Sequence, residues 1–283
     1  MKKQFLVSKL SFFLILCISL FGCINSEKSK IIADHIAIDA GFKKKLVKGA
    51  DFLFTTYQKP ITKGEPFIFY IEGDGNVGSK YILSKDPTPK HPMLLKLAFM
   101  DKRPNVVYIA RPCQYTNFTL NPKCNYSYWS NKRWSEDSVI AMNDAIKEIS
   151  QGKNIELIGF SGGGAMAILI AARTPQVKKI ITLAGNLDVK AFNDHHRLPL
   201  SASIGSLNPM DFVQKVKNIP QVHFIGENDT RMPAFITDKF VTAVNAASPQ
   251  HCARYEILPH VTHTKKWEKF WDYIMRAPVV CEK

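Results

Sequence analysis

Residues 156–165 read ELIGFSGGGA, a stretch in which an apolar run meets an alanine- and isoleucine-rich run through Ser161, a serine with glycine neighbours. The stretch contains the pattern G-x-S-x-G, which about one chain in ten of this length carries by chance at average glycine and serine frequencies. Its position is more specific, because a nucleophilic serine needs a strand before it and a helix after it. The stretch therefore predicts either a nucleophile or a glycine-rich turn.

The rest of the chain alternates between strand and helix patterns. Continuous apolar runs are typical of strands buried on both faces, and they occur at 66–71, 105–110, 154–160, 178–184 and 221–225, with a more polar edge-side strand at 253–258 and two short strands at 43–48 and 51–57. Helical patterns occur at 135–149, 165–173, 209–216, 233–247 and 265–275. The alternation predicts an α/β fold, with a mostly parallel central sheet and helices on both faces. We expect a single domain over 36–283.

A catalytic serine needs a base, and the base needs an orienting acid. In a sheet of this kind the expected chain order is serine, acid, histidine. Residues 226–230 (GENDT) follow the strand at 221–225, and residues 259–264 (PHVTHT) follow the strand at 253–258. An acid and a histidine would therefore both lie at carboxyl ends of strands, where ligands bind. The candidate acids are Asp229, Glu227 and Asp188, and the candidate bases are His263 and His260.

These residues together resemble the α/β-hydrolase family over most of 40–277. The resemblance implies Ser161 as nucleophile, Asp229 as acid and His263 as base, with no cofactor. It also implies an oxyanion hole, because residues 72–75 (EGDG) look like the H-G-x-G loop of the family with a glutamate in place of the histidine. The oxyanion donors would be the amides of Asp74 and Gly162.

Glu72 and Asp74 would add negative charge beside the oxyanion. We expect them to be turned away or paired with Arg111 or Lys80. Gly164 is the one glycine of the stretch that the motif does not require, and close helix–strand packing would explain it.

A narrower resemblance is to a subgroup of bacterial envelope α/β-hydrolases. It rests on residues 71–75 (IEGDG), 111–115 (RPCQY), Trp129 and 206–209 (SLNP), and it implies a disulfide between Cys113 and Cys124. The loop 115–134 carries six aromatic residues, which either line an apolar acyl pocket or pack the loop onto the sheet: Tyr115, Phe118, Tyr126, Tyr128, Trp129 and Trp134.

The N-terminus resembles a bacterial lipoprotein signal over 1–22. Three lysines precede an apolar run at 10–21 that is too short to span a bilayer comfortably. Residues 20–23 (LFGC) resemble a lipobox, in which Cys23 would carry the lipid (a palmitate-type acyl group); the alternative is an ordinary signal peptide cleaved nearby. Residues 23–35 would then be a tether. By resemblance to lipoprotein sorting patterns, Ile24 in place of an aspartate after Cys23 implies the outer membrane. We therefore expect a periplasm-facing, lipid-anchored protein at the cell envelope.

Four cysteines remain after Cys17 and Cys23 are assigned to the signal and the anchor. Local spacing favours Cys113–Cys124 and Cys252–Cys281, although four cysteines allow three pairings. We expect no metal site, because neither a CxxC pair nor a cysteine–histidine cluster with ligand spacing is present.

The formal net charge is +14. We expect no nucleic-acid partner, because the basic residues are scattered and no recognition motif accompanies them. The predicted function is therefore serine hydrolysis of an ester, thioester or amide bond, on a small-molecule or lipid-like acyl substrate, by a monomer. The alternative is a non-catalytic binding or scaffold protein on the same fold.

Overall fold

The computed structural model describes residues 26–79 and 82–282. The predicted signal peptide, Cys23 and Lys80 lie outside these residues. Within them, no helix is both long and apolar enough to cross a membrane.

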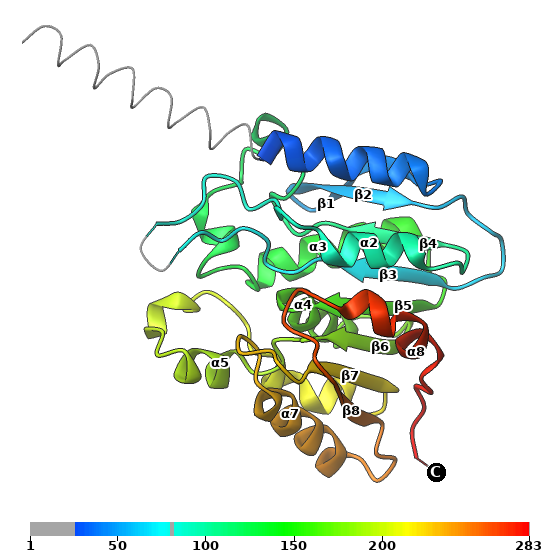
Figure 1. Ribbon diagram of the computed structural model, residues 1–283, viewed down its shortest axis with the longest axis vertical. Coiled ribbons are helices and arrows are strands. Elements are labelled where there is room, and N and C mark those ends of the chain that lie inside the picture. Colours follow the sequence, from blue (N-terminus) through cyan, green and yellow to red (C-terminus); the bar gives the residue numbers. More distant parts are fainter. Residues whose placement is uncertain (1–25, 80–81, 283) are drawn as a thin grey trace, which may run out of the picture.

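A central sheet of eight strands organises the fold (Figure 1). The strands are β1 (Lys43–Gly49), β2 (Phe52–Gln58), β3 (Phe67–Ile71), β4 (Val106–Ile109), β5 (Ile155–Phe160), β6 (Val177–Leu183), β7 (Gln221–Gly226) and β8 (Ala253–Leu258). Their order is β1-β2-β4-β3-β5-β6-β7-β8. The β1–β2 and β2–β4 pairs are antiparallel, and all others are parallel. The predicted α/β fold is confirmed, and β8 is an edge strand as expected.

The helices lie on both faces of this sheet. They are α2 (Met93–Met100), α3 (Glu136–Ser150), α4 (Gly162–Ala171), α5 (Val189–His195), α6 (Val213–Val216), α7 (Ala234–Ala247) and α8 (Trp271–Arg276), with 3₁₀ turns at Phe118–Leu120, Tyr126–Trp129, Leu200–Ala202, Pro209–Phe212 and Trp267–Phe270. The helices predicted at 209–216 and 265–275 therefore begin as 3₁₀ turns.

One hydrophobic cluster lies on each face of the sheet, and β3 shows how the two clusters arise. Phe67, Phe69 and Ile71 point into the cluster that holds α3, α4 and α6, whereas Ile68 and Tyr70 point into the cluster that holds α2 and α8. Side chains of a strand alternate between faces, so a fully apolar strand supplies both layers at once.

The tether predicted over 23–35 differs from the structure, because residues 26–39 form a helix. Ala33 and Ala37, one turn apart, are buried in the second cluster, and Tyr57 Oη donates to Asp34 Oδ1 at 2.6 Å. The small side chains let the helix lie close to the sheet. The folded body therefore begins before residue 36, where the domain boundary was expected.

Two disulfides are present among the described cysteines, Cys113–Cys124 and Cys252–Cys281. They are the pairing that local spacing favours, and the prediction is confirmed. The first closes the long loop after β4, and the second holds the C-terminal segment against the start of β8.

Candidate active site

Ser161 lies on a strained corner between β5 and α4. Its φ of 51° and ψ of −118° place it in a region that residues with a side chain rarely adopt. Gly159 and Gly163 leave room for this corner, because a Cβ on Gly159 would meet the carbonyl oxygen of Gly163 at 2.4 Å and one on Gly163 would meet that of Ile71 at 2.1 Å. A Cβ on Gly164 would approach the Cα of Gly185 to 2.7 Å. The predicted close packing of Gly164 is therefore present, and its partner is the chain just after β6.

Ser161, His263 and Asp229 form a continuous chain of hydrogen bonds. His263 Nε2 lies 3.1 Å from Ser161 Oγ, and His263 Nδ1 lies 2.8 Å from Asp229 Oδ2. A carboxylate only accepts hydrogen bonds, so Nδ1 of the neutral ring carries the hydrogen and Nε2 accepts from the serine. The structure thus brings together the three residues that the sequence singled out.

Neighbouring groups fix the acid and the base in these positions. Asp229 is buried, and its Oδ1 accepts from the amides of Arg231 and Met232, both at 2.9 Å. The His263 ring packs against Phe160 with ring centroids 5.0 Å apart. These contacts leave each side chain little freedom to rotate out of the chain of hydrogen bonds.

The alternative acids and base lie elsewhere. Asp188 caps the start of α5 through the amide of Ala191 and pairs with Lys239 at 2.7 Å. Glu227 is exposed and accepts from the amide of His260 at 2.8 Å. Among the described residues, no hydrogen bond or ion pair joins Asp188, Glu227 or His260 to Ser161 or His263.

The expected oxyanion donors come from two different strand ends. The amide of Gly162 is the first of α4, and the amide of Asp74 lies just after β3. No described residue accepts a hydrogen bond from either amide. The loop and the helix start lie very close together, because a Cβ on Gly162 would approach Asp74 Oδ1 to 1.9 Å. Two free amides beside a serine can stabilise an oxyanion.

Two arginines neutralise Asp74. Arg111 Nη1 lies 3.3 Å from Oδ1, and Arg133 Nη1 lies 3.2 Å from Oδ2. Arg111 also donates to the backbone carbonyl of Arg133, so the two guanidinium groups are fixed relative to each other. Arg111 is one of the two partners that we expected, whereas Arg133 was not foreseen.

Glu72 points behind the oxyanion loop and is only 3% exposed. Its carboxylate accepts from the amide of Gly73 at 2.8 Å and from Tyr108 Oη at 2.7 Å. Burial raises the pKa of Glu72 to about 7, against the effect of these hydrogen bonds and of Arg111. The residue therefore carries less negative charge near neutral pH than an ordinary glutamate.

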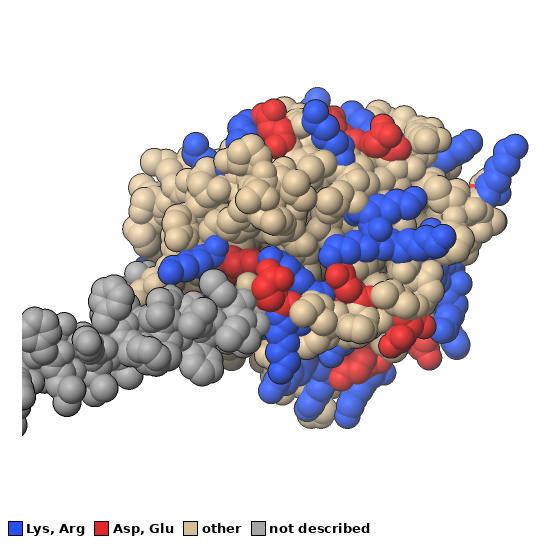
Figure 2. Space-filling view, turned by 90° about the horizontal axis from the view of Figure 1, so that it is seen from above, with Lys and Arg blue, Asp and Glu red and all other residues tan. Residues whose placement is uncertain are grey.

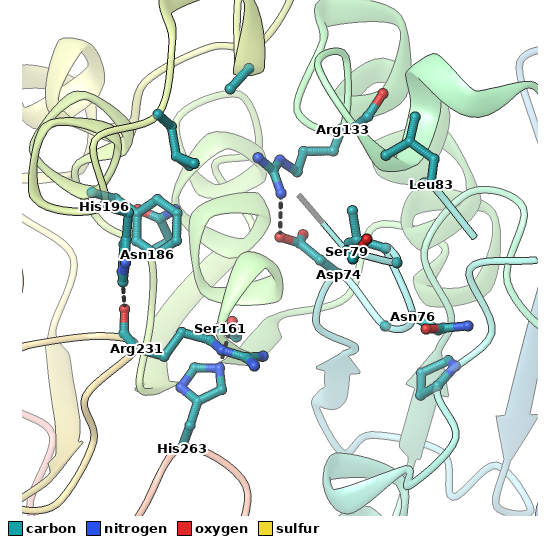
Figure 3. Close-up of a pocket in the computed structure, with 18 of the residues that line it drawn as sticks. Asp74, Asn76, Ser79, Leu83, Arg133, Ser161, Asn186, His196, Arg231 and His263 are labelled. Carbon is teal, nitrogen blue, oxygen red and sulfur yellow. Dashed lines mark hydrogen bonds and ion pairs between the residues drawn. The ribbon is translucent and has the colours of Figure 1, made fainter. Parts of the chain in front are cut away.

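An open cleft of about 910 Å³ contains Ser161 and His263 (Figure 3). Its walls come from the loop after β3, the end of the disulfide loop and the segment that carries α5. The described residues hold no cluster of three or more metal-ligating side chains.

The aromatic residues of the loop 115–134 do not line this cleft. Trp129 Nε1 donates to the carbonyl of Ser84, and Trp134 Nε1 donates to the carbonyl of Gly162 at 2.8 Å. Four of the six are buried: Tyr115, Tyr128, Trp129 and Trp134. Of the two alternatives for this loop, the structure shows the second, because the buried rings pack the loop onto the sheet.

Sequence reasoning missed three residues of the cleft with nitrogen-bearing side chains, Arg133, His196 and Arg231. Arg133 lies in the aromatic loop just before Trp134, and His196 directly follows α5. Arg231 is two residues after Asp229, and this proximity to an expected site residue was the one usable signal.

The sheet order, the strained serine and the hydrogen-bonded Ser–His–Asp arrangement define a serine hydrolase of the α/β-hydrolase fold. The sequence model of the family described as "Serine hydrolase (FSH1)" matches residues 93–257, more than half of the chain. The chain belongs to this family. The match includes Ser161 and Asp229, whereas the oxyanion loop and His263 lie outside it.

Solved structures of the same fold include enzymes of different kinds. A puromycin-hydrolysing peptidase of Mycobacterium tuberculosis aligns with a TM-score of 0.61 and 14% identity, over 82% of this chain and 37% of the peptidase. The chain thus spans little more than a third of that protein. A Pyrococcus furiosus esterase has a TM-score of 0.55 and 14% identity, over 84% of this chain and 90% of the esterase.

A membrane phospholipase A described as a bacterial virulence factor also aligns, with a TM-score of 0.55 and 14% identity, over 97% of this chain and 100% of the phospholipase. At such identities these likenesses establish the fold alone. None of the curated proteins matches the chain in sequence.

Proposed function

We propose that the protein is a serine esterase of the cell envelope, with Ser161 as nucleophile, His263 as base and Asp229 as orienting acid. The observation that carries the proposal is the hydrogen-bonded chain from Ser161 through His263 to Asp229 in an open cleft. All three residues come from one chain, so a monomer suffices for the reaction.

The geometry supports acyl transfer in two steps. Ser161 Oγ attacks the ester carbonyl carbon while its proton passes to His263 Nε2, and the amides of Asp74 and Gly162 hold the oxyanion. The C–O bond to the alcohol then breaks as His263 returns the proton to the departing oxygen. Water, deprotonated by His263, releases the acid and restores Ser161. Asp229 stays ionised and holds the imidazole tautomer.

An activity-based label tests the catalytic role. We expect a fluorophosphonate probe to label the wild type at one site and to leave Ser161→Ala unlabelled, with unchanged thermal unfolding. Ser127→Ala, a serine outside the cleft, is the matched control and should label normally. Absence of labelling in the wild type would favour a binding or scaffold role on a retired hydrolase fold. Thioester and amide substrates, tested beside acyl esters of graded length, define the bond that is cleaved.

We also propose that a lipid on Cys23 anchors the enzyme to the membrane, with the outer membrane favoured. The start of the helix at 26–39 supports this arrangement, because Lys30 pairs with Asp86 at 3.2 Å, in the loop segment that precedes the cleft residue Pro89. The described chain begins on the side of the molecule where the strand-end loops gather (Figure 1). An anchor near this end would hold the cleft close to the bilayer surface.

Metabolic labelling with a fatty-acid analogue tests the anchor. The wild type should incorporate the label and fractionate with membranes, and Cys23→Ser should do neither. Release of unlabelled wild-type protein into the soluble fraction would contradict the lipid anchor and favour an ordinary cleaved signal peptide.

A further inference from the structure

We propose that the cleft is built for an ester that carries an anionic group, a carboxylate or a phosphate, near the scissile bond, and that Arg231 binds this group. The inference rests on the proposed esterase function and names its substrate class. Three observations carry it: the charge of the wall beside Asp74, the free guanidinium of Arg231, and the balance of charge in the cleft.

The wall beside the oxyanion loop carries more positive than negative charge. Among the described residues, Asp74 is the single carboxylate that pairs with the guanidinium groups of Arg111 and Arg133, so these three side chains together carry one net positive charge. Arg111 is 4% exposed and lies behind the wall, whereas Arg133 lines the cleft. The Arg133 guanidinium packs 4.6 Å from the ring of Trp134, and its buried Nε has no acceptor among the described residues.

Arg231 supplies a second guanidinium from another strand end. Its amide donates to Asp229 Oδ1 at 2.9 Å, and its carbonyl accepts from His196 Nε2 at 2.8 Å, so its backbone is fixed. Its side chain extends into the cleft on the side of Ser161 and His263 (Figure 3). No carboxylate of the described residues pairs with this guanidinium, whereas Arg133, the other arginine in the lining, is paired with Asp74. Arg197 and Arg276 also lack a carboxylate partner among the described residues, but they lie outside the cleft.

The charge balance of the described residues that line the cleft has the same sign. They include the cations Lys90, Arg133 and Arg231 and the carboxylates Glu72 and Asp74. Even with Glu72 fully ionised, the cations of the lining exceed its carboxylates by one, and the charges directly behind the lining, Arg111 and Asp229, offset each other. Clefts lined by one sign of charge concentrate ligands of the opposite sign.

The chemistry of the Arg231 guanidinium limits the class of ligand that it can bind. A guanidinium presents parallel N–H donors that match the two oxygens of a carboxylate or a phosphate. On the face seen in Figure 2, Lys and Arg side chains lie among Asp and Glu. The Arg231 guanidinium, by contrast, has no carboxylate partner among the described residues, so it is the group of the cleft that is available to an anion.

Matched substrate pairs test the proposal and separate the two anions. For a carboxylate, kcat/KM is measured for mono-p-nitrophenyl glutarate and p-nitrophenyl valerate, which have five-carbon acyl groups with and without the charge. For a phosphate, it is measured for a 1-acylglycerol 3-phosphate and the monoacylglycerol of the same acyl chain. We expect the charged member of at least one pair to be preferred about tenfold or more, the range of a charge-assisted hydrogen bond.

The preference should depend on Arg231. We expect Arg231→Gln to lower the charged-to-neutral ratio about tenfold, Arg231→Lys to retain part of it, and raised salt to lower it in the wild type. Arg276→Gln is the matched control, because this arginine is exposed at the end of α8 and outside the cleft; its ratio should equal that of the wild type.

Two outcomes overturn the inference in distinguishable ways. If Ser161 is labelled and the neutral esters are cleaved, but neither anion is preferred or the ratio survives Arg231→Gln, the anion site is wrong and the esterase function stands. If none of the four esters is cleaved and Ser161 is not labelled, the esterase function itself fails.

Discussion

The carboxylate of Asp74 lies against Gly162, so closely that a Cβ on the glycine would meet Oδ1 at 1.9 Å. This contact joins the loop after β3 to the first residue of α4, and each side provides one expected oxyanion amide. Arg111 and Arg133 hold the carboxylate in place. The spacing of the two amides therefore depends on a residue that has no side chain.

Gly162→Ala tests this dependence. The added methyl group would push Asp74 and its loop away from α4 and widen the oxyanion hole, and we expect kcat/KM to fall about 100-fold, the loss typical of one missing donor. Thermal unfolding checks that the fold is retained.

A double-mutant cycle compares Gly162→Ala and Asp74→Ala with the double variant Gly162→Ala/Asp74→Ala. Because the clash needs both side chains, the combined loss should be smaller than the product of the two single losses. If the two single losses of kcat/KM instead multiply in the double variant, the contact between Gly162 and Asp74 does not set the geometry of the oxyanion hole.

Asp229→Asn tests the orienting acid. An asparagine amide can donate to His263 Nδ1 and so favour the wrong tautomer, and we expect kcat to fall about 10⁴-fold, as in other Ser–His–Asp enzymes. Glu227→Gln is the control, since this neighbouring carboxylate contacts His260 instead. A loss confined to the Glu227 variant would reverse the assignment.

Glu72→Gln tests the buried carboxyl. Burial raises the pKa of Glu72 from 4.5 to about 7. Between pH 4.5 and pH 7, Glu72 is protonated more often in the folded chain than in the unfolded chain. The contribution of Glu72 to the free energy of unfolding therefore falls as the pH rises through this range, and it is constant at higher pH. Glutamine does not titrate, so we expect the free energy of unfolding of Glu72→Gln not to show this decrease. At pH 8 the variant should be more stable than the wild type, by at most ~3 kcal/mol.

Urea unfolding of both proteins from pH 4 to pH 8 provides the comparison. The exposed Glu65→Gln is the control and should follow the wild type at every pH. A constant difference between Glu72→Gln and the wild type across this range would contradict the raised pKa of Glu72.

Local pattern was sufficient for most of the fold and for part of the site. The apolar runs that became β3 and β5 identify strands because such runs can be buried on both faces. Ser161 could be singled out because it directly follows a predicted strand. Asp229 and His263 lie in the segments after the next two strands, and the family resemblance selected them over Glu227 and His260. Residues 26–39 misled the prediction, because Ser, Glu and Lys at the start are typical of a tether. What decides their state is the burial of Ala33 and Ala37 against distant elements.

The sequence by itself determined the strand order in the chain, the strained serine corner and the residues able to act as acid and base. These properties are local, because each depends on a few consecutive residues and on the end of one strand. Only the tertiary structure decided that the aromatic loop packs inward, and that Arg111 and Arg133 converge on Asp74, 37 and 59 residues away. It also decided that the Arg231 guanidinium lies in the cleft with no carboxylate partner among the described residues. Charge balance at a site depends on contacts between distant segments, and no periodicity along the chain encodes them.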